Sequence, residues 1–527
     1  MWQSIEVATC GRIFVFAWSV AETTCLRFIL TGKVCLQAAV VSFASEPNYG
    51  LSLLIHATNI PRDPPPPTFY APGINMFYDR KNNLVVHVMT GLLVLLFAGC
   101  FGPSYSRRLM PTPIGITAGM PYPGSDATDS WDNVSETVPV FVVSGRNIDP
   151  EKKGLDPFGS QRSHRPAMGI AQVKIGEGLS PDQLREETTT DRKKKTANVE
   201  FSEIELTPWS ANMSPWRVKD EIVRHHDHAW VKAVNQQLVE TGSQHATIFV
   251  HGYNTEFVDN TLLAAEIYHY LGRQGAMISF EWPSESKLLG YMADKGNANY
   301  STRHFRALIS NLAKECDVDS ITIIAHSAGS PIVVNALREI RLLEFELTPE
   351  EIQEKYRVNN VVLAAPDMDM MAFINAVYDR FYEVSGKVAV YASTRDRALE
   401  FSQWVYGNTR LGRAVGNLEP WESQSLQAVP EIQMVDASEA EERHKNFLGH
   451  GYFHRDPWVS SDIGLFILGR PPASRGLVKD AGGVFWKFPE DFPERLTQLA
   501  ELRRPARVAK THNFQDDQPP AQPSLAR

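Results

Sequence analysis

From Val138 onward, short apolar and β-branched runs alternate with longer stretches of helical spacing, and this alternation limits the folds open to the chain. Each short run suits one buried strand, and each longer stretch can return the chain to the same edge of a sheet. The pattern predicts an α/β fold, a mostly parallel sheet with helices on both faces. The predicted strands lie at residues 138–144, 246–251, 276–282, 320–325, 361–365, 387–393 and 432–435.

The composition is that of a folded protein, with 43% hydrophobic and 21% charged residues in a chain of 527. The formal net charge of -9 argues against a nucleic-acid partner, because such proteins turn a basic face to the phosphates. The sequence has no glycine-rich loop that would cradle a phosphate, so we expect no organic cofactor. The His-rich run at residues 225–228 cannot turn all its imidazoles to one ion on a helix, so we expect no metal site.

Residues 1–75 differ from the rest of the chain. Apolar patches there are broken by polar residues and are followed by four prolines at residues 64–67. We expect an irregular segment, or an over-extended reading frame whose true translation start is Met76.

The segment at residues 76–100 has the layout of a secretion signal. Arg80 and Lys81 precede an apolar run at residues 84–97, and Ala98 and Gly99 lead to Cys100. The end resembles a bacterial lipobox, in which the cysteine becomes the lipidated first residue. We therefore expect an exported or cell-envelope protein attached to the membrane through Cys100. A buried core helix, a membrane anchor and a cleaved secretory signal are the alternatives.

Composition also predicts the remaining boundaries. Residues 101–136 are rich in Gly, Pro, Ser and Thr, which predicts a flexible linker. The α/β domain is expected at residues 137–470. Residues 471–527 show little periodicity and are expected to form a largely irregular extension, with Phe485 and Trp486 as docking residues.

One predicted strand leads into a helix through a serine. Residues 321–330 read Ile-Thr-Ile-Ile-Ala-His-Ser-Ala-Gly-Ser, and helical spacing follows. Ser327 stands at the corner between the small residues Ala325 and Gly329. The arrangement resembles the G-x-S-x-G elbow of α/β-hydrolases, in which a strained turn exposes the nucleophilic hydroxyl. A serine that caps a helix is the alternative for a lone motif, but the strand and helix context favours a nucleophile.

An oxyanion hole would need two backbone amides close to this serine. Ala328, directly after the nucleophile, is one candidate. The strand at residues 246–251 is followed by a loop in which Tyr253 or Asn254 can supply the other. His251 precedes the nucleophile in the chain, whereas this fold has the order nucleophile, acid, histidine, so we expect a structural role for it.

The expected order offers an acid and a base downstream. Asp396 follows the strand at residues 387–393, and Asp367, one strand earlier, is its rival for the triad acid. His450 lies in a glycine-flanked loop after the last strand of the series, where His444 and His454 compete with it. We favour Asp396 to orient the imidazole of His450, which then serves as the base.

Several motifs together resemble a bacterial α/β-hydrolase family of unknown function, number 900, described as esterase- or lipase-like. The resemblance covers about residues 138–467. It departs from the family at Ala328, where Met is common, and at Ser330, where Asn is usual. It implies the α/β-hydrolase fold and hydrolytic machinery and leaves the substrate open. The motifs that carry it are Val-His251-Gly-Tyr-Asn254, Ser279-Phe-Glu-Trp282-Pro-Ser284 with Tyr291 and Asp294, His326-Ser327-Ala-Gly329, Ala365-Pro-Asp367, Tyr391-Ala-Ser393 with Asp396-Arg-Ala-Leu399, and Gly449-His450-Gly-Tyr-Phe453.

The sequence thus predicts a serine hydrolase that acts on small-molecule or lipid carboxylic esters through an acyl-enzyme. Two alternatives stay open. One is a catalytically inactive α/β-hydrolase fold that serves as a binding module at the cell envelope. The other is an amidase or thioesterase with the same triad.

Overall fold

The computed structural model describes the strands within residues 13–59, and residues 105–120, 136–152, 155–190, 195–207, 229–284, 291–439 and 449–502. The chain divides into two compact units, Met1–Ala98 and Gly99–Arg527. The predicted signal segment and Cys100 lie outside the described residues.

The first unit contains an antiparallel sheet whose strands are adjacent in chain order. Sequence analysis expected no regular structure there. The strand residues are nevertheless rich in Val, Ile, Phe and Thr, which fit a pleated surface. The start of translation at Met76 stays a prediction. The strands are β1 (Ile13–Val20), β2 (Thr23–Thr31), β3 (Leu36–Ser45) and β4 (Leu51–Asn59).

The second unit contains a twelve-stranded sheet in the order β15-β16-β14-β13-β12-β11-β9-β10-β6-β7-β8-β5. Neighbours from β16 to β6 pair in parallel, and β6-β7-β8-β5 and β15-β16 pair antiparallel. The strands are β5 (Ser106–Arg108), β6 (Thr137–Ile148), β7 (Phe158–Ile175), β8 (Asn198–Thr207), β9 (His245–Val250), β10 (Ala276–Glu281), β11 (Ser320–His326), β12 (Val358–Ala364), β13 (Ser385–Ala392), β14 (Ile432–Asp436), β15 (Val478–Lys479) and β16 (Phe485–Lys487).

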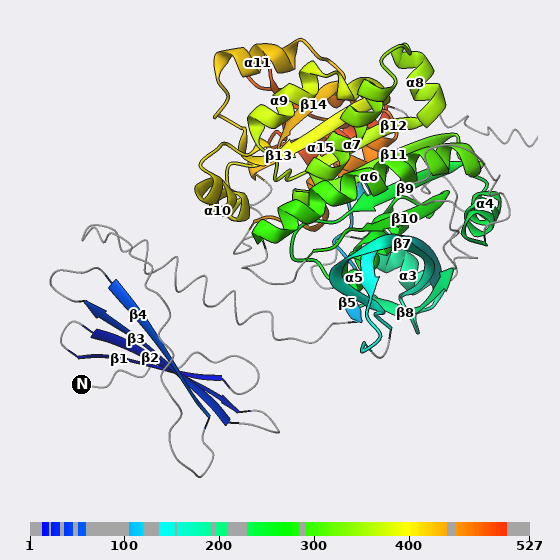
Figure 1. Ribbon diagram of the computed structural model, residues 1–527. Helices are drawn as coiled ribbons and strands as arrows, with labels where there is room; N and C mark the ends of the chain where they lie inside the picture. Colours follow the sequence, from blue (N-terminus) through cyan, green and yellow to red (C-terminus); the bar gives the residue numbers. More distant parts are fainter. Residues whose placement is uncertain are drawn as a thin grey trace, which may run out of the picture. The chain divides into compact units, whose positions relative to one another are not determined.

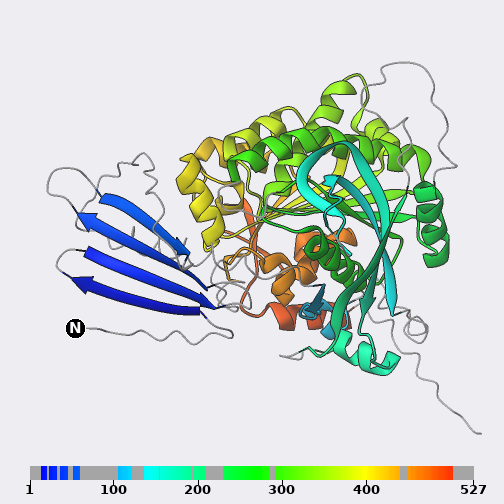
Figure 2. The same ribbon diagram turned by 60° about the horizontal axis from the view of Figure 1, so that its bottom comes forward.

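Helices cover both faces of this sheet, as Figures 1 and 2 show. Alternate residues of one strand supply the two cores: Ile248 and Val250 belong to one apolar cluster and Phe249 to the other. The first cluster receives α4, α6, α7, α8 and α9, and the second receives α5, α14 and α15. The helices are α2 (Ile114–Thr117), α3 (Pro181–Thr189), α4 (Ala229–Thr241), α5 (Phe257–Tyr270), α6 (Tyr291–Glu315), α7 (Ser330–Leu343), α8 (Pro349–Tyr356), α9 (Met370–Tyr378), α10 (Arg397–Tyr406), α11 (Pro420–Gln427), α13 (Tyr452–Arg455), α14 (Pro457–Ile467) and α15 (Phe492–Glu501).

The predicted fold class is confirmed, and each strand expected from the apolar runs is present with small shifts at its ends. The antiparallel strands β7 and β8 were not predicted, because they lack the continuous apolar runs by which the parallel strands were recognised. Among the helices of the described residues, none is long and apolar enough to cross a bilayer.

Part of the predicted linker is ordered instead. β5 pairs with β8, and Leu109, Met110 and Met120 are buried in the core. The proline- and glycine-rich composition hid these few apolar anchors, which supply the burial that fixes the segment.

The predicted irregular extension also differs from the structure as far as residue 502. Phe485 is buried and β16 extends the parallel sheet beside β14, while α15 packs on the second cluster. Arg475 is fully buried, and its Nε lies 2.7 Å from Asp462 Oδ1 on α14. The other carboxylate oxygen of Asp462 accepts a 2.7 Å hydrogen bond from Tyr391 in β13. This ion pair ties the extension to the core.

We expect Arg475→Met to lower the free energy of unfolding by about 3–5 kcal/mol, because it leaves the carboxylate of Asp462 buried without its cation. Chemical denaturation measures the change. Arg495→Met is the matched control, since its partner Asp491 lies at the surface of α15 and such pairs contribute about 0–1 kcal/mol. Equal losses in the two variants would show that the buried pair has no special role.

Candidate active site

Ser327 lies at the corner between β11 and α7, where a short 3-10 helix, Ser327–Gly329, joins the two. Its φ of 52° is in the left-handed region, which residues other than glycine seldom adopt. Such strain persists only where the surroundings enforce it, and a strained strand-to-helix turn is the hallmark of a nucleophile elbow. The structure therefore gives Ser327 the backbone geometry that the sequence predicts.

Two glycines allow this corner to press against the end of β9. A Cβ on Gly329 would lie 2.4 Å from the carbonyl oxygen of His251 and 2.9 Å from that of Val250. A Cβ on Gly252 would lie 2.9 Å from Cβ of Ser327. The loop after β9 is thus in direct contact with the serine.

Asp396 and His450, 54 positions apart in sequence, meet at the carboxyl edge of the sheet. His450 Nδ1 lies 2.6 Å from Asp396 Oδ2. The other oxygen of Asp396 accepts from the amide of Leu399 and caps α10. Asp396 is fully buried, whereas the side chain of His450 is 19% exposed. A fixed carboxylate behind an accessible imidazole is the arrangement that orients a general base.

His326 connects the histidine loop to the elbow. Its Nε2 donates a 3.1 Å hydrogen bond to the carbonyl oxygen of His450, and the two rings lie 4.8 Å apart. The ring of His326 also packs against Phe453, with 4.7 Å between the ring centroids. Because His326 directly precedes Ser327, these contacts bring the segment of the expected base to the expected nucleophile.

The rival residues make other contacts. Asp367 accepts from Ser402 Oγ at 2.7 Å and lies 3.2 Å from Arg410 Nε, while its amide donates to the carbonyl of Ser327. Through this amide, Asp367 supports the backbone of the elbow. His454 is buried, and burial holds its pKa well below the usual value. His444 lies outside the described residues.

The candidate oxyanion donors are placed differently. Ala328 is the middle residue of the 3-10 helix that precedes α7 and is partly buried. The amide of Asn254, whose φ is 53°, donates to Ser284 Oγ at 3.0 Å. Since that amide is already engaged, Tyr253 is the better candidate of the two alternatives for the second donor.

His251 is held in the interior. Its ring stacks on Trp282 at 5.1 Å with 10° between the planes, and its Nδ1 bonds the carbonyl of Gly252. Burial, and then the charge of Arg146, hold its pKa well below the usual value. These contacts give His251 a structural place beside the elbow.

Arg146, which sequence analysis did not single out, lies beside His251 and is buried. Arg146 comes after the apolar residues of β6, at a position where either a solvent-facing or a core residue would be ordinary. The signal that could have found it in the sequence was a cation shortly after an apolar run.

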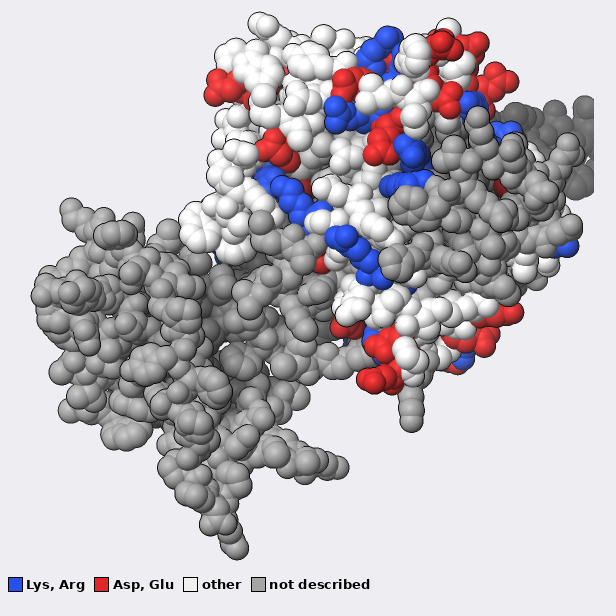
Figure 3. Space-filling model, viewed as in Figure 1, with Lys and Arg blue, Asp and Glu red and all other residues white. Residues whose placement is uncertain are grey.

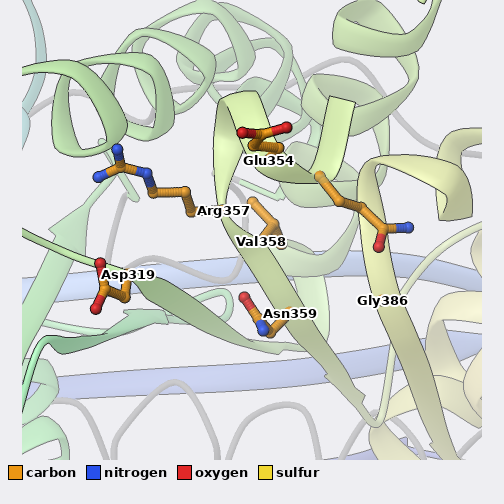
Figure 4. Close-up of a pocket in the computed structure, with 7 residues that line it drawn as sticks. Asp319, Glu354, Arg357, Val358, Asn359 and Gly386 are labelled. Atoms are coloured by element: carbon orange, nitrogen blue, oxygen red, sulfur yellow. The ribbon is translucent and has the colours of Figure 1, made fainter. Parts of the chain in front are cut away.

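A depression in the structure lies away from the candidate site. It has a volume of about 260 Å³ and is lined by Asp319, Glu354, Arg357, Val358, Asn359 and Gly386, with Gln353 (Figure 4). These residues precede or begin β11, β12 and β13, whereas Ser327 follows β11. At roughly 3.3 Å per residue, the length of β11 separates the two ends by about 25 Å. The depression is therefore remote from the elbow.

The distribution of charged residues and of metal-binding side chains was compared with this site. On the face in Figure 3, basic and acidic residues are interspersed over the described surface. Within the described ranges no group of three His, Cys, Asp or Glu side chains is arranged to hold a metal ion. The His-rich run at residues 225–228 falls outside those ranges.

Comparison with known proteins identifies the matching family. The model described as "Alpha/beta hydrolase of unknown function (DUF900)" matches residues 226–467. This confirms the predicted family resemblance, and it includes Ser327, Asp396 and His450.

Individual relatives are more distant. An uncharacterised protein of Nostoc sp. (strain PCC 7120) is 25% identical over 173 residues, covering 26% of this chain and 45% of that protein. The chain thus spans about half the length of this curated relative. Crystal structures of esterase B from Lactobacillus rhamnosis, one of them with a tributyrin phosphonate inhibitor, are 14–15% identical and have a TM-score of 0.25. They cover 43% of this chain and 74% of the esterase.

We expect Gly329→Ala to destabilise the fold by roughly 1–3 kcal/mol, because the new methyl group meets backbone carbonyls of β9 that cannot rotate away. Gly145→Ala is the control, since its nearest neighbours would be 3.6 Å away. Thermal unfolding of both variants provides the measurement. An unchanged melting temperature in Gly329→Ala would contradict the close packing of the elbow.

Proposed function

We propose that this chain, whose residues 226–467 match the DUF900 α/β-hydrolase model, is a serine hydrolase of carboxylic esters with the triad Ser327, Asp396 and His450. The observation that carries the proposal is the left-handed backbone of Ser327 at the strand-to-helix corner. It is supported by the pairing of buried Asp396 with partly exposed His450, whose carbonyl accepts a hydrogen bond from His326, the neighbour of Ser327.

In the proposed mechanism, His450 takes the proton of the Ser327 hydroxyl as the oxygen attacks the ester carbonyl. Asp396 holds Nδ1 of the imidazole and stabilises the positive charge that the ring gains. The amides of Ala328 and Tyr253 donate to the oxyanion of the tetrahedral intermediate. The intermediate collapses to an acyl-enzyme and releases the alcohol, which takes the proton from His450. Water then repeats the sequence and releases the acid.

The buried position of Asp396 supports its role over that of Asp367. Both of its carboxylate oxygens are used, one by the α10 cap and one by His450. Asp367 instead faces the guanidinium of Arg410. The contacts of Asp367 with Arg410 and Ser402 give it a structural role.

We expect Ser327→Ala to abolish hydrolysis of short-chain aryl esters without unfolding the protein, and to abolish covalent labelling by a fluorophosphonate probe. Asp396→Asn should lower kcat by roughly 10³–10⁴-fold, because the wrong imidazole tautomer is then held. Spectrophotometric assay and gel detection of the probe measure these changes.

Asp367→Asn is the control for the acid, and it should keep kcat within about tenfold of the wild type. A larger loss in this variant than in Asp396→Asn would transfer the acid's role to Asp367. A wild-type protein that stays unlabelled by the probe would instead support the inactive binding module. Parallel assays with aryl amides and acyl thioesters separate an esterase from an amidase or thioesterase.

We also propose that the protein is exported and attached to the membrane through a lipid on Cys100. The support is the order of basic residues, apolar run and Ala-Gly-Cys at residues 80–100. In cells fed a labelled fatty acid, the full chain should incorporate the label and Cys100→Ser should not. Mass spectrometry of the mature protein should place its first residue at Cys100. Peptides that precede Met76 would contradict the proposed translation start.

A further inference from the structure

A single buried arginine lies where two active-site loops meet. Arg146 is in the carboxyl half of β6, and only 3% of its surface is exposed. Burial lowers its pKa from the usual value, and the nearby carboxylate of Glu281 opposes that shift. Because a desolvated guanidinium is costly, its presence requires several specific partners.

The partners come from the loops after β9 and β10. Arg146 Nη2 donates to the carbonyl oxygen of Thr255 at 2.7 Å, and Nη1 donates to that of Ser284 at 3.2 Å. Nη2 is also 3.3 Å from His251 Nε2. The planar guanidinium has its donors in a fixed fork, so it sets the distance between these two loops in a way that a flexible ammonium does not.

Ser284 extends this connection to Asn254, the residue after the candidate oxyanion donor. Its Oγ accepts from the amide of Asn254 and donates to Asp294 Oδ2, each at 3.0 Å. Asn254 adopts a left-handed backbone at φ 53°. The two residues that follow Tyr253 are therefore fixed, Asn254 by Ser284 and Thr255 by Arg146.

Glu281 supplies the opposite charge. Its Oε2 lies 3.9 Å from Arg146 Nε and 3.5 Å from His251 Nε2. Its other oxygen accepts from Asn260 Nδ2 and Ser279 Oγ. Arg146 and Glu281 thus each bind neutral groups of the domain as well as facing one another.

We propose that Arg146 is a positioning residue for the oxyanion hole, which fixes the loop at residues 252–255 so that the Tyr253 amide is directed to the developing oxyanion. This inference rests on the proposed function. Fixed donors act mainly in the transition state, so their misplacement lowers kcat more than it raises KM. Displacements of about 1 Å can cost roughly a hundredfold in rate.

The test is Arg146→Lys in the full chain, which keeps the charge and removes the fork. We expect kcat on aryl esters to fall by about a hundredfold while KM changes less than about threefold. Ser284→Ala, which removes the acceptor of the Asn254 amide, is the milder second variant and should lower kcat about tenfold. If Arg146→Lys does not fold, Ser284→Ala decides the question.

Arg341→Lys is the matched control. Arg341 is also buried, pairs with Glu383 at 2.8 Å and donates to the carbonyl of Glu344, but it lies on α7 away from the loops. We expect Arg341→Lys to lose stability comparably and to keep kcat. An equal loss of kcat in Arg146→Lys and Arg341→Lys would overturn the proposal. So would an unchanged kcat in folded Arg146→Lys or in Ser284→Ala.

Amide hydrogen exchange separates this inference from the proposed function. In Arg146→Lys the amides at residues 253–255 should exchange at least tenfold faster than in the wild type, and in Arg341→Lys they should not change. If the wild type fails to react with a fluorophosphonate, the proposed function fails, while the exchange result still tests whether Arg146 fixes the loop at residues 252–255. Unchanged exchange in Arg146→Lys would refute the role of Arg146 whatever the activity.

Discussion

The left-handed backbone of Ser327 is the constraint on which the candidate site depends. That conformation is held because β11 runs parallel to β9, with Ala325 opposite Val250, and because Gly329 can approach the last carbonyls of β9. The same close contact places the loop after β9 against the serine. One packing condition therefore positions the expected nucleophile and its expected oxyanion donors together, and any side chain at Gly329 would disturb both.

The Asp–His pair is joined to the fold by a different device. Asp396 lies between β13 and α10. One of its carboxylate oxygens caps α10 and the other binds His450. Its carbonyl oxygen also accepts from Arg413. The carboxylate is therefore oriented by the same bonds that start a helix, and no separate support is needed. His450, by contrast, is placed by its loop and by the contact with His326, which leaves its ring partly exposed.

The sequence predicted those features that depend on local pattern. Parallel strands buried on both faces appear as continuous apolar runs, and the elbow at Ser327 has a short signature of small residues. Asp396 and His450 were selected by their place after particular strands, and the structure brings them within 2.6 Å. Arg146, the ion pair of Arg475 with Asp462, and the ordered residues 105–120 depend on neighbours distant in sequence. No periodicity encodes such contacts. The choice between Tyr253 and Asn254 likewise required the position of Ser284.

The large sheet ends on both sides in very short strands, β5 with three residues and β15 with two. A long, flat outer strand would present a row of unpaired amides and carbonyls, ready to add a strand from another molecule. Here the outermost strands, β5 and β15, themselves offer room for only one or two such bonds each. The two short strands thus cover part of the edges that β8 and β16 would otherwise present to a copy of the chain.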